Sequence, residues 1–414
     1  MYNFLSLSFF LVCSSVLLVP LLFSSGVRFI SSSLVSNDYL VFDSLSFYLV
    51  LLVLFLGIYS VVSLNSGFSL NTKFFLGTSL FFSMMCFCVN HSVLFWCFYE
   101  LSMLPLLYLI FRDSPYSERF IAGWYFAVYL LITSLPLILV LLYLSFINGS
   151  CFFSNWGLSV APMSVYIALA FIFFTKVPLS PFHTWLPIVH AEATSIVSIF
   201  LSGYIMKLGL LGVYRCAPFL FSGSFFFYLF CCCVFSVFFL ITASGELDGK
   251  RWLAFLSLSH IVVPFLSFYV CDWETVSLAF LFCLGHGLSA GLVFGLLWLF
   301  YDVSNTRNWV MLKSGISGQS LIYVVLVGLL SLCSFPPTLQ FFCEVNLLSV
   351  SSSSFVFLAF WACYLFFGGL VPLVLCGHVL IRNECVESVE FSLFPFILYF
   401  FYLFMWCYLG VVLL

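Results

Sequence analysis

Runs of about 20 apolar residues, the length that crosses a bilayer as a helix, follow one another along almost the whole chain. Of the 414 residues, 64% are hydrophobic and only 7% are charged. A water-soluble domain of this length could not cover its surface with so few polar side chains. The sequence therefore predicts an all-α, polytopic membrane protein.

The apolar runs predict about 13 transmembrane helices. Short polar links, such as the one around Asn90 and His91, separate neighbouring runs and leave no room for a soluble domain. The predicted spans are 4–23, 41–63, 74–89, 92–111, 120–147, 161–187, 193–214, 225–243, 252–270, 276–300, 320–349, 355–380 and 391–414.

The basic residues are distributed unevenly between the two sets of loops. Loops after odd-numbered spans contain two of them, Arg28 and Arg215, and loops after even-numbered spans contain eight. By the positive-inside rule, loops rich in Lys and Arg stay on one side of the membrane, here called the positive side. With 13 spans, this bias predicts that the amino end lies on the positive side and the carboxyl end on the opposite side. The eight are Lys73, Arg112, Arg119, Lys250, Arg251, Arg307, Lys313 and Arg382.

Two predicted spans are interrupted by proline next to a lone ionisable residue. Lys176 precedes one break, and Glu344 follows the other. Loosened backbone and bare charge are tolerated in a bilayer core only where protein or a water-filled cavity surrounds them, which indicates an internal ion path. The prolines are Pro178 and Pro181, within FTKVPLSPFHTWLP, and Pro336 and Pro337, within SFPPTLQFFCEVNLL.

The two breaks occupy equivalent places in a duplicated unit. The broken span is fourth in the group of spans 3 to 7 and fourth again in the group of spans 8 to 12. Because five is odd, the second group starts from the opposite face, and the two groups are predicted to be inverted repeats. The expected segments are amino-terminal helices in 1–73, a first antiporter-like repeat in 74–215, a second inverted repeat in 223–380 and a final helix in 391–414.

Four further ionisable residues lie near the middle of predicted spans: Glu100, Lys207, His260 and His286. A central Asp, Lys or Arg costs roughly 2.5 to 3.5 kcal/mol on insertion scales, so a use for these side chains is expected. Glu100 and Lys176 are expected to pair and to titrate as one unit. No phosphate-binding loop or dinucleotide fingerprint is present, so the driving energy must come from another chain or another ion.

Other reactive side chains receive simpler interpretations. The 17 cysteines fall in apolar stretches without a paired C-x-x-C and histidine set, which predicts neither disulfides nor a metal site. Lys250 is either functional or an anchor on the positive face. The remaining candidates are expected near the membrane interface, His183, His190 and Glu192 with function left open, and His91 and His378 as plain interfacial residues.

The first proline break lies within KVPLSPFHTWLPIVHAEATSIVSIFLSGYIMKLGLLGVYR. This stretch resembles the signature of the mitochondrially encoded chain 4 family of NADH-ubiquinone oxidoreductase, respiratory complex I. Thr194 stands where the family usually has proline, and the predicted spans are one fewer than in the family. Further similar segments follow in chain order, from about Phe98 to Leu348: FYELSMLPLL, YLLITSLPLIL, GELDGKRWLAFLSLSH, GHGLSAGLVF and SFPPTLQFFCEVNLL.

The resemblance implies an antiporter-like subunit of the membrane arm, which moves protons while redox chemistry proceeds on other chains. The implied proton relay consists of Glu100 as partner of Lys176, Lys176 as proton-bearing centre of the first repeat, Lys207 with His260 and His286 as central relay, and Glu344 as the site of the second repeat.

The resemblance also implies a multi-pass location in the mitochondrial inner membrane and other complex I membrane-arm subunits as partners, including sibling antiporter-like chains. No cofactor is expected in this chain, whereas NADH, FMN, iron–sulfur clusters and ubiquinone are expected in the assembled complex. Nucleic acid is not an expected partner, because the net charge of -3 includes no basic patch. Two alternatives remain: a subunit of a cation/proton antiporter, and a structural spacer that kept the fold but lost conduction.

Overall fold

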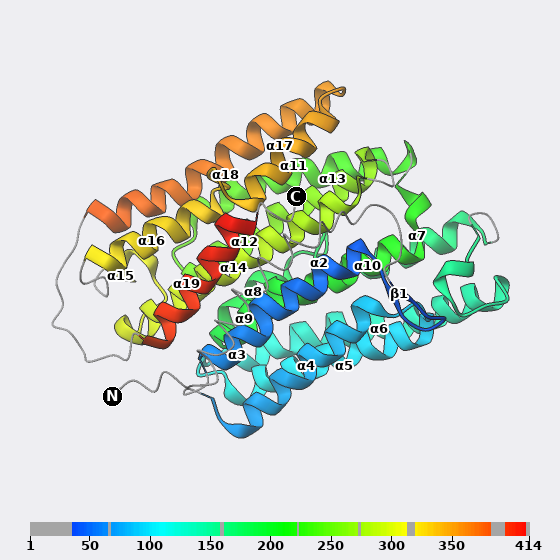
Figure 1. Ribbon diagram of the computed structural model, residues 1–414, viewed down its shortest axis with the longest axis horizontal. Coiled ribbons are helices and arrows are strands. Elements are labelled where there is room, and N and C mark those ends of the chain that lie inside the picture. Colours follow the sequence, from blue (N-terminus) through cyan, green and yellow to red (C-terminus); the bar gives the residue numbers. More distant parts are fainter. Residues whose placement is uncertain are drawn as a thin grey trace.

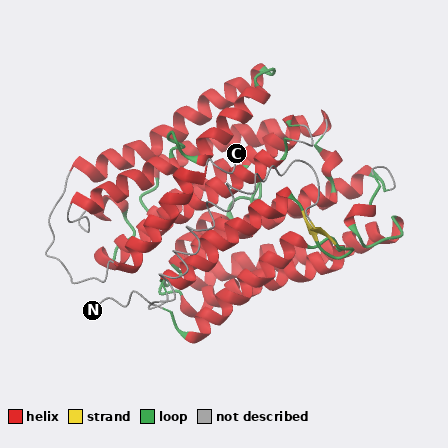
Figure 2. Ribbon diagram, viewed as in Figure 1, coloured by secondary structure: helices red, strands yellow, loops and turns green. Residues whose placement is uncertain are grey.

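Long helices lying side by side make up almost all of the described chain (Figure 2). The computed structural model describes residues 35–64, 68–157, 161–221, 223–271, 275–312, 319–381 and 394–410. The span predicted at 4–23 lies outside these residues, as do Arg28, Lys313 and Arg382 of the predicted charge bias. Within the described ranges, the two short strands β1 (Val35–Ser36) and β2 (Val41–Phe42) form an antiparallel pair.

The first half of the chain forms the lower part of the bundle in Figure 1. Its longest helices, α4, α5 and α6, lie along one side and pack in sequence order. The elements are α2 (Ser44–Leu52), the π-helical segment η1 (Val53–Ile58), α3 (Tyr59–Ser63), α4 (Leu70–Cys88), α5 (Ser92–Asp113), α6 (Arg119–Ile147), the 3-10 turn η3 (Phe153–Asn155), α7 (Met163–Lys176), α8 (Trp185–Glu192), α9 (Ser195–Phe200), the π-helical segment η4 (Leu201–Ile205), α10 (Met206–Cys216) and the 3-10 turn η5 (Pro218–Leu220).

The second half of the chain also consists of long helices packed side by side. Helices α16, α17 and α18 lie on the side of the bundle opposite α4, α5 and α6, with α10, α12 and α14 between the two sides (Figure 1). The elements are the 3-10 turn η6 (Gly223–Phe225), α11 (Phe226–Gly245), α12 (Gly249–His260), α13 (Val262–Val270), α14 (Ser277–Ser304), α15 (Trp309–Leu312), α16 (Gln319–Leu332), α17 (Leu339–Ser351), α18 (Phe355–Ile381) and α19 (Phe394–Leu409).

The observed helices agree with the predicted spans to within a few residues, as α5 and α6 illustrate. In the described part of the chain, eight helices are long and apolar enough to cross a membrane. Three of the shorter apolar helices border the breaks in the spans predicted at 161–187 and 320–349, one at the first break and two at the second. The shorter apolar helices are Met163–Lys176, Leu321–Leu332, Leu339–Ser351 and Phe396–Leu409.

The core lies around α14. An apolar stretch of 18 residues in α14 is completely buried, and so is one in the segment Ser195–Cys216. In α6, only 35% of such a stretch is buried. Helix α14 packs against α2, α16, α17 and α19, which surround it on several sides. The ionisable residues of the central helices are therefore surrounded by protein and not by lipid.

Glycines let α2 and η1 approach α14 closely. Gly287 and Gly291, four residues apart, share one face of α14. A Cβ atom at Gly287 would lie 2.6 Å from Leu52, and one at Gly291 would overlap Leu56. Small residues at this spacing are the usual device for close helix packing in membranes.

The span predicted at 252–270 is also interrupted, which the sequence prediction missed. Helix α12 ends at His260 and α13 begins at Val262. The physical reason is Pro264, which has no N–H group to donate to the carbonyl of His260 four residues earlier. The carbonyl of the predicted relay histidine thus lacks its usual helical donor.

Candidate functional site

Lys176 and Glu100 form a buried ion pair at the first break. Lys176 is the last residue of α7 and Glu100 lies in the middle of α5. The Lys176 Nζ is 2.7 Å from Glu100 Oε1, and the two residues are 3% and 8% exposed. The ammonium also lies 4.2 Å from the centre of the Tyr99 ring. The break ends α7 where its last side chain meets a carboxylate, so the two charges balance each other inside the bundle.

Lys207 lies at the start of α10, directly after the π-helical segment η4. Its ammonium donates a hydrogen bond to the carbonyl of Ser202 within that segment, and its side chain is 3% exposed. Widened π-helical turns are frequent at functional sites because they disturb the regular backbone ladder. In the described chain no acidic side chain forms an ion pair with Lys207, in contrast to Lys176.

A small cavity lies beside Lys207 at the centre of the bundle. Ser257 Oγ and both ring nitrogens of His286 are buried there, and within the described chain they make no hydrogen bond. Buried polar groups nearly always have a partner, so these atoms indicate a place where protons or water can be exchanged. The cavity is lined by Met206, Lys207, Leu210, Ser257, His260, Ile261, Pro264, Phe282, Cys283 and His286.

A connected set of side chains leads from this cavity to the second break. The rings of His286 and His260 have centroids 4.9 Å apart, and His260 Nδ1 is hydrogen-bonded to the hydroxyl of Tyr364. That hydroxyl donates to Glu344 Oε1 at 3.4 Å. The same carboxylate oxygen accepts from Gln340 Nε2 at 3.1 Å. Glu344 is 3% exposed, so protein groups satisfy the carboxylate.

The predicted relay residues therefore form two groups. The first is the Glu100–Lys176 pair. The second extends from Lys207 along the cavity and the two histidines to Glu344. We call the set of Glu100, Lys176, Lys207, His260, His286 and Glu344 the buried row. In the described structure no hydrogen bond or ion pair connects the Glu100–Lys176 pair with Lys207. The hydroxyl of Tyr99 is buried and has no hydrogen-bond partner in the described chain. It lies close to Gly209 on α10, since a Cβ atom added at this glycine would be 3.7 Å from the hydroxyl oxygen.

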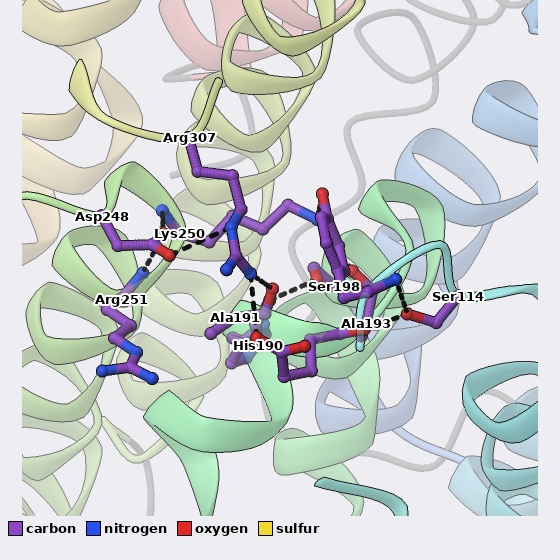
Figure 3. Close-up of polar contacts among 11 residues, drawn as sticks. Ser114, His190, Ala191, Ala193, Ser198, Asp248, Lys250, Arg251 and Arg307 are labelled. Atoms are coloured by element: carbon purple, nitrogen blue, oxygen red, sulfur yellow. Dashed lines mark hydrogen bonds and ion pairs between the residues drawn. The ribbon is translucent and has the colours of Figure 1, made fainter. Parts of the chain in front are cut away.

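A second polar cluster connects the two halves at the end of α8 (Figure 3). Arg307 donates to the carbonyl of Ala191 at 2.6 Å and to Glu192 Oε1 at 3.0 Å. Its Nε lies 3.4 Å from Asp248 Oδ2, the residue that caps α12. Ser114 donates to the carbonyl of Glu192. The last carbonyls of α8 are therefore satisfied by side chains from distant segments.

Lys250 belongs to the same cluster and is 3% exposed. Its Nζ donates to the carbonyl of Ala193 at 2.7 Å and lies 5.0 Å from the centre of the Tyr116 ring. The guanidinium of Arg307 lies 4.3 Å from the same ring. Burial, and then the neighbouring Tyr301 hydroxyl, raise the pKa of Tyr116 above its ordinary value, so its hydroxyl stays protonated.

The predicted interfacial residues are less exposed than expected. His190 and Glu192 are 0% and 3% exposed, because α6 and α12 pack against α8 and the Arg307 cluster covers its end. His183 is partly buried against Phe239. The other two histidines have local structural roles, His91 as the cap of α5 and His378 in ring contact with Trp309.

Comparison with known proteins identifies the family. The family model described as "NADH:quinone oxidoreductase/Mrp antiporter, TM" matches residues 89–368, well over half of the chain and including the whole buried row. The chain belongs to this NADH:quinone oxidoreductase/Mrp antiporter family. The membership confirms the resemblance predicted from the sequence motifs.

Several relatives in this family are named NADH-ubiquinone oxidoreductase chain 4. The chain is 29% identical over 267 residues to that of Rhipicephalus sanguineus (64% of this chain, 61% of the relative) and 29% over 267 residues to that of Myxine glutinosa (62% and 57%). The relative from Ascaris suum is 28% identical over 292 residues (67% of each chain). The matches thus span about three fifths of the length of the first two relatives.

Solved structures share the fold of this family member. A chain of respiratory complex I from Thermus thermophilus with bound NADH matches with a TM-score of 0.81 and 20% identity, over 97% of this chain and 89% of that chain. A chain of the Mrp complex from Dietzia sp. DQ12-45-1b matches with a TM-score of 0.74 and 15% identity, over 92% and 74%. An antiporter-like membrane fold is therefore common to this chain and both structures.

The sequence did not predict the uncharged polar residues that contact the buried row. Tyr364 and Tyr99 lie in apolar helices where an aromatic residue gives no polar signal. Gln340 precedes Glu344 by four residues, so the helical i,i+4 rule could have identified it as a neighbour. In the described ranges, no group of three His, Cys, Asp or Glu residues is placed to hold a metal ion.

Proposed function

We propose that the chain is a proton-translocating core membrane subunit of NADH-ubiquinone oxidoreductase, respiratory complex I, in the mitochondrial inner membrane. The observation that carries the proposal is the buried row, whose titratable side chains lie in both halves of the bundle. Family membership and the names of the eukaryotic relatives support the setting. Intramembrane ionisable residues surrounded by protein are the expected components of a proton relay.

The buried row gives the proton a sequence of carriers. Glu100 holds the ammonium of Lys176, so a loss of negative charge on Glu100 weakens the attraction that keeps the lysine proton in place. Lys207 has a carbonyl and no carboxylate as its bonded partner, so it exchanges its proton with the cavity more readily than Lys176 does. The two histidines can each take up and release a proton, and Glu344 receives it at the second break.

The architecture of the proposed subunit is duplicated. We place the two inverted five-helix repeats at 74–215 and 223–380, with amino-terminal helices in 1–73 and a final helix in 391–414, about 13 helices in all. The α7–α8 and α16–α17 interruptions support this proposal, because each lies beside an ionisable residue of the row. In both, half-helices end inside the bundle, where freed backbone groups can hold water or a side chain.

The energy must come from outside this chain. Moving one charge against the membrane potential requires about 2.3 kcal/mol per 100 mV. We assign the redox steps, with NADH, FMN, iron–sulfur clusters and ubiquinone, to other chains, and none of these groups to this one. The proposed enzyme is therefore the assembled, proton-translocating NADH:ubiquinone reductase, and the partners are its membrane-arm subunits, sibling antiporter-like chains among them.

The alternative within the family is a subunit of a cation/proton antiporter, which the fold shared with the Mrp complex supports. Purification of the native assembly separates the two functions. Comigration with flavin and iron–sulfur subunits, with proton movement driven by NADH in sodium-free buffer, supports the complex I subunit. Sodium-dependent proton flux without such subunits supports the antiporter. An inert spacer predicts normal proton movement after substitution of every residue of the buried row.

A further inference from the structure

Tyr364 joins the central histidines to the terminal carboxylate. It projects from α18 between His260 at the end of α12 and Glu344 on α17, and it is 1% exposed. Within the described chain, its hydroxyl is the group that contacts both of these titratable residues. We propose that Tyr364 is a relay residue, through which a proton passes from His260 to Glu344; this inference rests on the proposed function.

The hydrogen-bond directions define the resting arrangement. The Tyr364 hydroxyl has one hydrogen, which it donates to Glu344 Oε1. Its oxygen must then accept from His260 Nδ1–H, because an ionised carboxylate cannot donate. His260 therefore carries its hydrogen on Nδ1. The other ring nitrogen of this cavity-lining residue, Nε2, is left to take up a proton.

The transfer balances in protons and leaves every other bond intact. A proton arriving at His260 Nε2 forms a new N–H bond, and the Nδ1–H bond breaks as its proton moves to the Tyr364 oxygen. The original Tyr364 O–H bond breaks as that proton moves to Glu344 Oε1, which becomes a neutral acid. One proton enters at Nε2, one is held at Glu344, and nothing is oxidised or reduced. This proton relay returns to its starting state when Glu344 releases its proton and the His260 imidazole returns to the Nδ1–H form.

The surroundings hold Tyr364 in a position suited to this role. The neighbouring Trp361 donates its indole N–H to Ser351 Oγ at 2.8 Å, and its ring packs edge-on against Tyr364 with centroids 5.5 Å apart. The ring of His260 lies edge-on to the tyrosine as well, at 5.6 Å. A phenol fixed in this way keeps its hydroxyl within reach of both partners without a large side-chain movement.

The test is a comparison of Tyr364→Phe with Tyr399→Phe in the assembled complex, reconstituted into vesicles and driven by NADH. Tyr399 is a matched control, since it is fully buried and donates its hydroxyl to the carbonyl of Gly291, not to a titratable group. Native gels establish that both variants assemble. Positioned proton transfer contributes about 10² to 10⁴-fold, so we expect Tyr364→Phe to slow proton pumping ten-fold or more and Tyr399→Phe to leave it within two-fold.

A double variant separates relay from structure. If Tyr364 acts by passing protons to Glu344, adding Tyr364→Phe to Glu344→Gln slows pumping no further, whereas a structural role gives additive losses. Equal pumping in Tyr364→Phe and Tyr399→Phe, or additive losses in the double variant, overturns the inference. Full pumping in Glu344→Gln and Lys176→Ala overturns the proposed function itself, whatever the result at Tyr364.

Discussion

The ammonium of Lys176 lies 2.7 Å from the carboxylate of Glu100, with both side chains buried at the point where α7 is broken. The pair joins residues 76 positions apart in the sequence. Removing one partner of such a pair leaves an uncompensated charge, which costs about 3 to 5 kcal/mol unless the remaining group becomes neutral. The protonation of Lys176 is therefore tied to the charge on Glu100.

Glu100→Gln is expected to leave Lys176 neutral and to slow coupled NADH–quinone turnover about ten-fold or more, because the lysine proton is no longer held for transfer. Turnover and proton uptake are measured together in inner-membrane vesicles. The control is Glu118→Gln, at an exposed position before α6. A Glu100→Gln complex that turns over like the Glu118→Gln complex would mean that the pair has only a structural role.

Much of the fold could be predicted, because a helix that crosses a lipid bilayer must be apolar along the part that lies in the bilayer. The ends of α5 and α6 lie within two residues of the predictions, since apolar runs must match the bilayer. The Glu100–Lys176 pair was predictable for a related reason, because a bare charge in a membrane needs a partner.

The finer features depend on contacts that hydropathy does not report. His190 and Glu192 read as interfacial because polar residues flank a predicted span end, yet α6 and α12 pack against them. The hydrogen bond from Lys207 to Ser202 requires a π-helical turn, which has no reliable sequence signature. Tyr364 joins residues 104 and 20 positions away on two other helices, and hydropathy does not indicate which faces of distant helices meet.

Arg307→Ala is expected to destabilise the assembled protein by about 3 to 5 kcal/mol, because it leaves the buried carboxylate of Glu192 without its ion-pair partner. The midpoint of thermal denaturation in detergent measures the effect. Arg112→Ala is the control, since the exposed Arg112–Asp113 contact of 3.9 Å is worth about 0 to 1 kcal/mol.

The double variant Arg307→Ala with Glu192→Gln should recover part of this loss, since it removes the orphaned charge along with its partner. Equal midpoints for Arg307→Ala and Arg112→Ala would show that the cluster at the end of α8 does not stabilise the protein.

Gly291→Val is expected to lower the amount of assembled protein, because its side chain would overlap Leu56 where η1 packs on α14. Overpacking of this kind costs about 1 to 3 kcal/mol. Gly77→Val in α4 is the matched control, since a Cβ atom there meets nothing within 4 Å. Quantitative native gels compare the two variants, and similar yields would argue against close packing at Gly291.

Proton pumping by the Lys176→Ala complex tests the central claim most directly. The assembled complex is reconstituted into vesicles, and the rate of proton uptake driven by NADH is recorded with a pH-sensitive dye alongside the rate of quinone reduction. The buried row predicts that assembly persists while proton uptake falls ten-fold or more, in line with the loss of a positioned proton carrier. Proton uptake at the unsubstituted rate, in a complex that assembles normally, would contradict it.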